Sequence, residues 1–152
     1  RAGHDQVRFK IAGKGLSMRL AHAIGQDDRL EYAGYVEDIH EFVGTAWLSV
    51  VPLRIGSGSR LKILESMALG TPVVSTTIGC EGIRAVPDKQ IRISNKSSEF
   101  AAAVRALLKD KAMRNRLSEN GRKFVEEHYN WEKVGEKALN SMSQLLLSKN
   151  ID

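Results

Sequence analysis

The stretch GSGSRLKILE, residues 56–65, places glycines and serines directly before a helical pattern that carries two cations and one carboxylate. Free amides at the amino end of a helix attract anions, and glycines let a phosphate approach the backbone without a Cβ in the way. Each charge at such an end is worth only about 0.3–1 kcal/mol when exposed, so a tight phosphate site needs several donors. We therefore expect an anion-binding loop that consists of Gly56, Ser57, Gly58, Ser59 and Arg60.

The helix that follows this loop carries a second candidate group. On a wheel of about 100° per residue, Lys62 and Glu65 lie at the edge of one broad apolar sector. That sector contains Leu61, Ile63, Leu64, Met67 and Ala68. We expect a half-buried Glu65 beside Lys62, where the carboxylate can accept hydrogen bonds from the vicinal hydroxyls of a sugar. The alternatives are an ordinary surface pair and a loop that only changes the direction of the chain.

Strand and helix patterns alternate around this segment. Strands are expected over residues 7–13, 29–34, 47–52, 72–76 and 90–94. Helices are expected from about residue 16, over 37–43, over 60–69 and after a cap at Ser97 or Ser98. Because each parallel crossover needs a helix to return the chain, this order predicts an α/β fold with a Rossmann-like, doubly wound parallel sheet.

A helix pair without an intervening strand is expected at the carboxyl end. It covers residues 111–127 and 131–148, and Asn130 is the expected N-cap of its second helix. That helix has an apolar stripe formed by Val134, Ala138, Met142 and Leu145.

Ligands of open parallel sheets bind beyond the carboxyl ends of the strands, where the strand-to-helix turns gather. Besides the loop at residues 56–59, two glycine-bearing turns fall there, Gly13-Lys14-Gly15 and Gly34-Tyr35-Val36. The turn at residues 13–15 has neither the length of a phosphate loop nor the spacing of a dinucleotide fingerprint, so by itself it is a weak signal.

The composition limits the class of protein, its location and its partners. The chain has 152 residues, 42% hydrophobic and 27% charged, which suits one compact domain, and no apolar run has the length of a membrane span. One cysteine and scattered histidines offer no metal site and favour a cytoplasmic location. The net charge of +5 is interleaved with acidic residues, and without a reading motif no nucleic-acid partner is expected. Because the chain opens on Arg1 rather than Met, we expect it to be cut from a longer protein.

The segment VPLRIGSGSRLKILESMALGTPVVSTTIGCEGI, residues 51–83, resembles the donor-binding signature of GT-B glycosyltransferases, in particular the large retaining group called family 4. Three further stretches resemble the same C-terminal domain in order and spacing. They are VRFKIAGKG at 7–15, RLEYAGYVEDIHEFVGTAWLSVVP at 29–52, and the segment from SSEF to YNW at 97–131.

The resemblance implies a two-domain enzyme that transfers a sugar from a nucleotide-sugar to an acceptor in polysaccharide or glycoconjugate synthesis. Residues 1–152 would form its nucleotide-sugar-binding half, without that half's first strand and without the N-terminal acceptor domain. This fragment alone would be inactive. The full-length enzyme would work in the cytoplasm or at the inner face of the membrane, to which it would bind peripherally.

The family pattern also assigns roles to particular residues. It has a glutamate, seven residues and a second glutamate that binds the ribose of the nucleotide; Glu65 matches the second. Ser57 stands at the first position, which is a departure, and Arg60 and Lys62 would compensate by contacting phosphate or sugar.

Two further contacts and two alternatives follow from the same resemblance. Gly13, Lys14 and Gly15 would border the diphosphate, and Tyr35 and Val36 would touch the base. No metal or other cofactor is expected, because basic groups and helix-end amides can stabilise the leaving diphosphate. The alternatives are an inactive glycosyltransferase-like binding or assembly module, which the departure at Ser57 motivates, and a sugar-nucleotide epimerase of the same architecture.

Overall fold

The computed structural model describes the backbone of residues 7–149 and the side chains through residue 146. Its contacts divide the chain into two compact units, Arg1–Phe42 and Val43–Asp152, where the sequence predicted one compact domain. The physical reason is the distribution of the core. Among the described residues, every buried side chain lies in the second unit.

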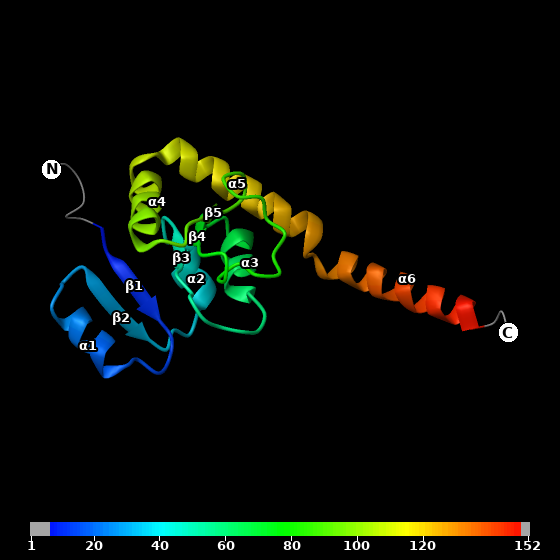
Figure 1. Cartoon of the computed structure of the whole chain (residues 1–152), viewed down its shortest axis with the longest axis horizontal. Coiled ribbons are helices and arrows are strands. Elements are labelled where there is room, and N and C mark those ends of the chain that lie inside the picture. Colours follow the sequence, from blue (N-terminus) through cyan, green and yellow to red (C-terminus); the bar gives the residue numbers. More distant parts are fainter. Residues whose placement is uncertain (1–6, 150–152) are drawn as a thin grey trace. The chain divides into compact units, whose positions relative to one another are not determined.

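Unit 1 is a strand–helix–strand unit, seen in Figure 1 as the blue part of the chain. Strand β1 (Phe9–Ala12) pairs in parallel with β2 (Leu30–Gly34), and α1 (Met18–Gly25) connects them. The register shifts between Ile11 and Ala12. The side chain of Ser17 caps α1 by accepting a hydrogen bond from the amide of Leu20 at 3.3 Å. Helix α2 (Ile39–Gly44) runs across the boundary between the units.

Unit 2 is built on a three-stranded parallel sheet in the order β3–β4–β5. These strands are Ser49–Val51, Val73–Ser75 and Arg92–Ile93, and the helices are α3 (Leu61–Ala68), α4 (Ser97–Lys109), α5 (Lys111–His128) and α6 (Trp131–Lys149). The predicted α/β class, the parallel pairing and the terminal helix pair are confirmed. The five strands are nevertheless distributed over two sheets, β1–β2 and β3–β4–β5.

The core of unit 2 lies on both faces of this sheet, because successive side chains of a strand point to opposite faces. Val73 belongs to a cluster with Ile63 and Met67 of α3, whereas its neighbour Val74 belongs to a second cluster with Leu107 of α4. Figure 1 shows α3 and α4 on opposite sides of β3–β4–β5. The helices therefore cover the sheet as the doubly wound pattern predicts.

The buried face of α3 differs from the predicted sector. Ile63, Ser66 and Met67 are buried, whereas Leu61 is 56% exposed and Ala68 is also exposed. The true face follows the i, i+3, i+4 spacing and includes a serine. Its hydroxyl can be buried because it donates a hydrogen bond to the backbone oxygen of Lys62 at 2.7 Å.

Helix α5 packs closely against α3. A Cβ at Gly121 would lie 3.2 Å from the backbone oxygen of Gln90 and 3.4 Å from Cγ of Met67, so the glycine permits the close approach. The hydroxyl of Ser118 donates to the backbone oxygen of Gly70 at 2.6 Å, just beyond the end of α3. The carboxyl end of α3 is thereby fixed.

The predicted caps had different outcomes. Asn130 accepts a hydrogen bond from the amide of Glu132 at 2.9 Å, which confirms it as the cap of α6. The predicted cap at Ser97 or Ser98 is wrong. Lys96, with an extended backbone, is the N-cap of α4, and both serines lie inside the helix. Ser97 accepts a hydrogen bond from the guanidinium of Arg54 at 2.6 Å instead.

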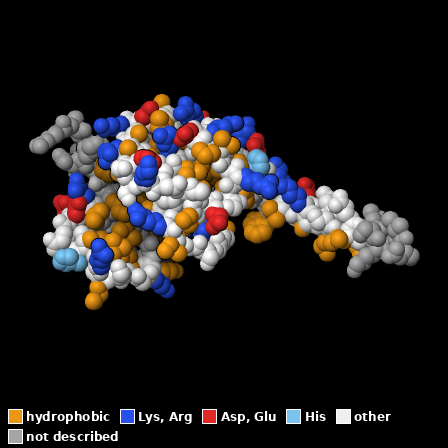
Figure 2. Space-filling view, viewed as in Figure 1, with side chains coloured by type: hydrophobic (Ala, Val, Ile, Leu, Met, Phe, Trp, Pro, Cys, Tyr) orange, Lys and Arg blue, Asp and Glu red, His pale blue; other side chains and the backbone are white. Residues whose placement is uncertain are grey.

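The apolar stripe of α6 lies on the surface. Val134, Met142 and Leu145 are all exposed, and Figure 2 shows hydrophobic side chains on this helix. None of the helices within residues 7–149 is both long enough and apolar enough to traverse a lipid bilayer.

Gly79 is the most tightly enclosed glycine of the loop after β4. An added Cβ would lie 2.3 Å from the Ser75 hydroxyl oxygen and 2.8 Å from the backbone oxygen of Val51. We expect Gly79→Ala to lower the free energy of unfolding by about 1–3 kcal/mol, as overpacking does. Urea unfolding followed by circular dichroism measures the change.

Gly44→Ala is the matched control, because an added Cβ there meets nothing within 4 Å. This variant should be unchanged or more stable by up to about 1 kcal/mol. Equal losses of stability in the two variants would contradict the steric explanation.

Candidate functional site

The loops that follow β3 and β4 are joined at the carboxyl ends of the two strands. The hydroxyl of Thr76 donates to the backbone oxygen of Leu53 and accepts from the amide of Gly79, the latter at 2.9 Å. The hydroxyl of Ser75 donates to the backbone oxygen of Val51 at 3.3 Å. These buried polar groups bind the loop before α3 to the loop after β4.

The loop after β5 is attached to the same edge of the sheet. The side chain of Asn95 accepts from the amide of Thr77 and donates to its hydroxyl, both at 2.9 Å. Together with the hydrogen bond between Arg54 and Ser97, this contact ties the loops that follow β3, β4 and β5 together. The candidate site therefore stands on a connected scaffold.

Arg60 is the centre of the glycine-serine loop. Its side chain is only 5% exposed, and its guanidinium donates to the backbone oxygens of Ser57 at 3.2 Å and Gly56 at 3.1 Å. The same guanidinium forms an ion pair with Glu81 at 3.3 Å. Its Nε is buried without a hydrogen-bond partner. Arg60 thus holds the loop from within.

The remaining loop residues and the first polar residues of α3 face solvent. All of Gly56, Ser57, Gly58 and Ser59 are exposed. Gly58 has φ 90°, a conformation that favours glycine. Arg60 is the N-cap of α3 and its side chain makes no capping hydrogen bond, so the first amides of the helix lack the partner that a capping side chain supplies. The loop at residues 56–59 is therefore accessible to a ligand, and its binding of an anion stays a prediction.

The prediction of a half-buried Glu65 beside Lys62 is wrong. Both residues are exposed, because the buried face of α3 centres on Ile63, Ser66 and Met67. The structure places Lys62 and Glu65 on the surface of the helix that follows the loop, where both can be reached by a ligand.

Unit 1 brings its own predicted residues together at the carboxyl ends of β1 and β2. The ammonium of Lys14 lies 5.1 Å from the centre of the Tyr35 ring, which is a cation–π contact. The hydroxyl of Tyr32 donates to the backbone oxygen of Gly13 at 2.6 Å and holds the turn. Gly13 and Gly15 have φ 135° and 81°, which explains the two glycines. Tyr35 is 72% exposed, and Val36 follows it directly.

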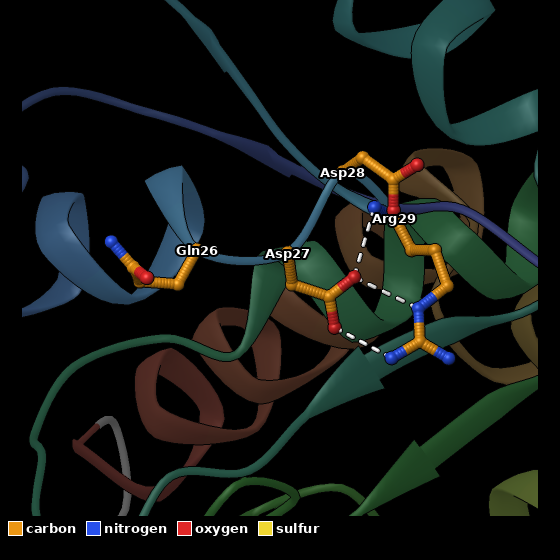
Figure 3. Close-up of a pocket in the computed structure, with 4 residues that line it drawn as sticks. All are labelled: Gln26, Asp27, Asp28 and Arg29. Carbon is orange, nitrogen blue, oxygen red and sulfur yellow. Dashed lines mark hydrogen bonds and ion pairs between the residues drawn. The ribbon is translucent and has the colours of Figure 1, made fainter.

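A polar pocket lies at the other end of β2, in the loop before the strand. It is lined by Gln26, Asp27, Asp28 and Arg29, none of them a predicted site residue (Figure 3). The guanidinium of Arg29 binds both oxygens of the Asp27 carboxylate, at 2.8 and 2.6 Å. These hydrogen bonds lower the pKa of Asp27 to about 2. The pair closes the turn that leads into β2.

Glu81, the charged partner of Arg60, is the residue of the candidate site that the sequence motifs did not single out. It lies in GCEGI, between glycines and directly after Cys80, in the loop that follows β4. A charged residue in a glycine-flanked loop at the carboxyl end of a strand was a signal that could have pointed to it. Cys80 itself packs in the core, and burial raises the pKa of its thiol. Among the described residues, no three His, Cys, Asp or Glu side chains gather as a metal site requires.

The pKa of Asp27 provides a test of the geometry of unit 1. We expect Arg29→Gln to raise this pKa from about 2 toward its ordinary range, because the charged hydrogen bonds to the carboxylate are lost. Since the folded-state pKa is lowered, the contribution of the pair is present above the ordinary pKa and is lost as the pH falls toward 2. Carboxyl carbon NMR against pH measures the shift.

Arg8→Gln is the matched control, since Arg8 donates to the backbone oxygen of Asp28 and not to the Asp27 carboxylate. This variant should leave the pKa of Asp27 low. A similar rise in both variants would show that net charge, and not the ion pair, sets the pKa.

Comparison with known proteins finds glycosyltransferases that the chain matches over part of their length. It is 31% identical over 137 residues to the lipopolysaccharide core biosynthesis glycosyltransferase LpsE of Rhizobium meliloti, covering 86% of this chain and 38% of that protein. The chain thus spans less than two-fifths of the length of this relative.

Solved structures share the fold. HepE from Anabaena, solved in complex with UDP, superimposes with a TM-score of 0.81 at 16% identity over 91% of this chain and 41% of that one. The C-terminal domain of a group 1 glycosyltransferase (LpcC) from Francisella tularensis gives a TM-score of 0.66 at 21% identity, covering 74% of this chain and 62% of that one. Residues 1–110 match the family described as glycosyl transferases group 1. The chain therefore belongs to the group 1 glycosyltransferases.

Proposed function

We propose that this chain is the donor-binding, C-terminal domain of a retaining GT-B glycosyltransferase of family 4. The observation that carries the proposal is the exposed loop Gly56–Ser59 at an uncapped helix start, with Glu65 exposed on the same helix. A neighbour of the same fold binds UDP, which supports a nucleotide-sugar as donor. The full-length enzyme transfers the sugar to an acceptor in polysaccharide or glycoconjugate synthesis.

The chemistry of the loop suits a diphosphate. Amides at the start of α3 and the hydroxyls of Ser57 and Ser59 are hydrogen-bond donors, and the helix dipole adds positive potential. Lys62 is exposed and supplies a charge for the phosphates. These groups stabilise the charge that develops on the leaving diphosphate, with no metal or other cofactor in the proposed reaction. Arg60, which is buried, acts on the diphosphate through the loop that it supports.

Glu65 is the proposed ribose ligand. Its carboxylate is exposed on α3, and a carboxylate can accept two hydrogen bonds from the vicinal hydroxyls of a pentose. In unit 1, the turn Gly13–Gly15 is proposed to border the diphosphate and Tyr35 with Val36 to contact the base. The close contact between Lys14 and Tyr35 supports a role for both residues.

The rest of the enzyme is proposed from the length of its relatives. Because LpsE is more than twice as long as the matched segment, an acceptor-binding N-terminal domain is the proposed partner. The proposed location of the complete enzyme is the cytoplasm or the inner face of the membrane, where it would bind peripherally. Ser57 favours one alternative, a binding or assembly module that has lost transfer, because a carboxylate is missing there.

Titration of UDP, GDP and ADP into the chain, followed by NMR, tests donor binding. We expect one of the three nucleotides to bind, and Glu65→Ala to weaken that binding by about tenfold, since a hydrogen bond to a charged group contributes about 1.5 kcal/mol or more. The matched control is Glu119→Ala, which removes an exposed carboxylate from α5. Equal affinity of the wild type and Glu65→Ala would remove Glu65 from the site, and no binding by the wild type would refute the proposed function.

A further inference from the structure

The ion pair between Arg60 and Glu81 joins two side chains with opposite environments. The Arg60 side chain is 5% exposed, whereas that of Glu81 is 74% exposed. A buried guanidinium is stable only where its charge and its donors find partners. Here two loop carbonyls and one carboxylate supply them, and Glu81 is the only partner among these that carries charge.

The position of Glu81 relative to Ser57 is fixed by this shared partner. One guanidinium donates to the backbone oxygen of Ser57 through Nη1 and to Oε2 of Glu81 through Nη2. The carboxylate of Glu81 therefore lies next to the part of the loop where residue 57 has only a hydroxyl. Although 24 residues separate the two positions in the sequence, they belong to one cluster of side chains and backbone.

The segment that carries Glu81 is anchored on both sides. The amide of Cys80 donates to the backbone oxygen of Thr76 at 3.2 Å, and the amide of Ile83 donates to that of Cys80 at 3.0 Å. Cys80 is buried in the core beneath the loop. A carboxylate on such a turn loses little freedom when it binds a ligand, which favours its use in recognition.

We propose that Glu81, oriented by the buried Arg60, supplies the carboxylate that accepts hydrogen bonds from the hydroxyls of the donor sugar. Arg60 is then a positioning residue. Ser57, which has no charge, leaves space beside the loop for the carboxylate of Glu81. This inference rests on the proposed function, and it adds a specificity-determining residue from a loop that the family pattern of paired glutamates does not include. The inference also gives a reason why the exposed carboxylate of Glu81 is paired with the buried guanidinium of Arg60.

The test measures how much the sugar adds to the affinity for the nucleotide. The nucleotide that binds best among UDP, GDP and ADP is compared with its glucose, mannose and N-acetylglucosamine conjugates by calorimetry. In the wild type we expect at least one conjugate to bind more tightly than the nucleotide alone. In Glu81→Gln that conjugate should lose about tenfold in affinity, as expected for a lost hydrogen bond to a charged group, while the nucleotide changes less than about twofold.

Two further variants keep the result interpretable. Glu119→Gln, at an exposed position of α5, should change neither affinity. Adding Ser57→Glu to Glu81→Gln should return the lost affinity for the conjugate, because a carboxylate is restored beside the same loop. Thermal unfolding of each variant shows that the comparison is made between folded proteins.

The outcomes distinguish this inference from the proposed function. A parallel loss of affinity for nucleotide and conjugate in Glu81→Gln would show that Glu81 only supports the loop, which overturns the inference and leaves donor binding in place. Unchanged affinity for every conjugate, or a failed rescue in a folded double variant, also overturns it. If the wild type binds no nucleotide, both proposals are refuted.

Discussion

A buried positive charge organises the edge of the sheet where the loops after β3 and β4 meet. The Arg60 guanidinium cannot remain in a nearly dry environment unless its hydrogen bonds are made inside the protein. Two of them fix the carbonyls of the glycine-serine loop, and a third reaches the loop after β4. A flexible, glycine-containing segment is thereby held in one arrangement. The position of the loop in front of the first amides of α3 depends on that arrangement.

Elements were predictable where local periodicity and neighbouring residues determine them. Strand and helix patterns alternate along the chain, and the structure has each expected element within a few residues of its predicted position. Details that depend on packing were not predictable. The wheel of α3 assigned Leu61 and Ala68 to the core and left out Ser66, because hydropathy alone does not show that a serine hydroxyl can be satisfied by its own helix. The exposure of Glu65 follows from the same rotation of the buried face.

In the candidate site, too, local features were predictable from the sequence and long-range contacts were not. The loop at residues 56–60 could be predicted because glycines, serines and a helix start are adjacent in the sequence. The partner of Arg60 could not, since Glu81 is 21 residues away and the contact arises only when β3 and β4 are paired. For the same reason, the division of the chain into two units has no local signature. The division depends on which side chains pack together in one core.

The uneven distribution of that core has a dynamic consequence. Among its described residues, unit 1 has no fully buried side chain, whereas unit 2 has two clusters on opposite faces of its sheet. The free energy needed to open a region transiently rises with the apolar surface that the region buries. Backbone amides of β1 and β2 are therefore expected to exchange their hydrogens with solvent through local opening, long before those of β4. Unit 1 can therefore adjust its conformation while unit 2 remains ordered.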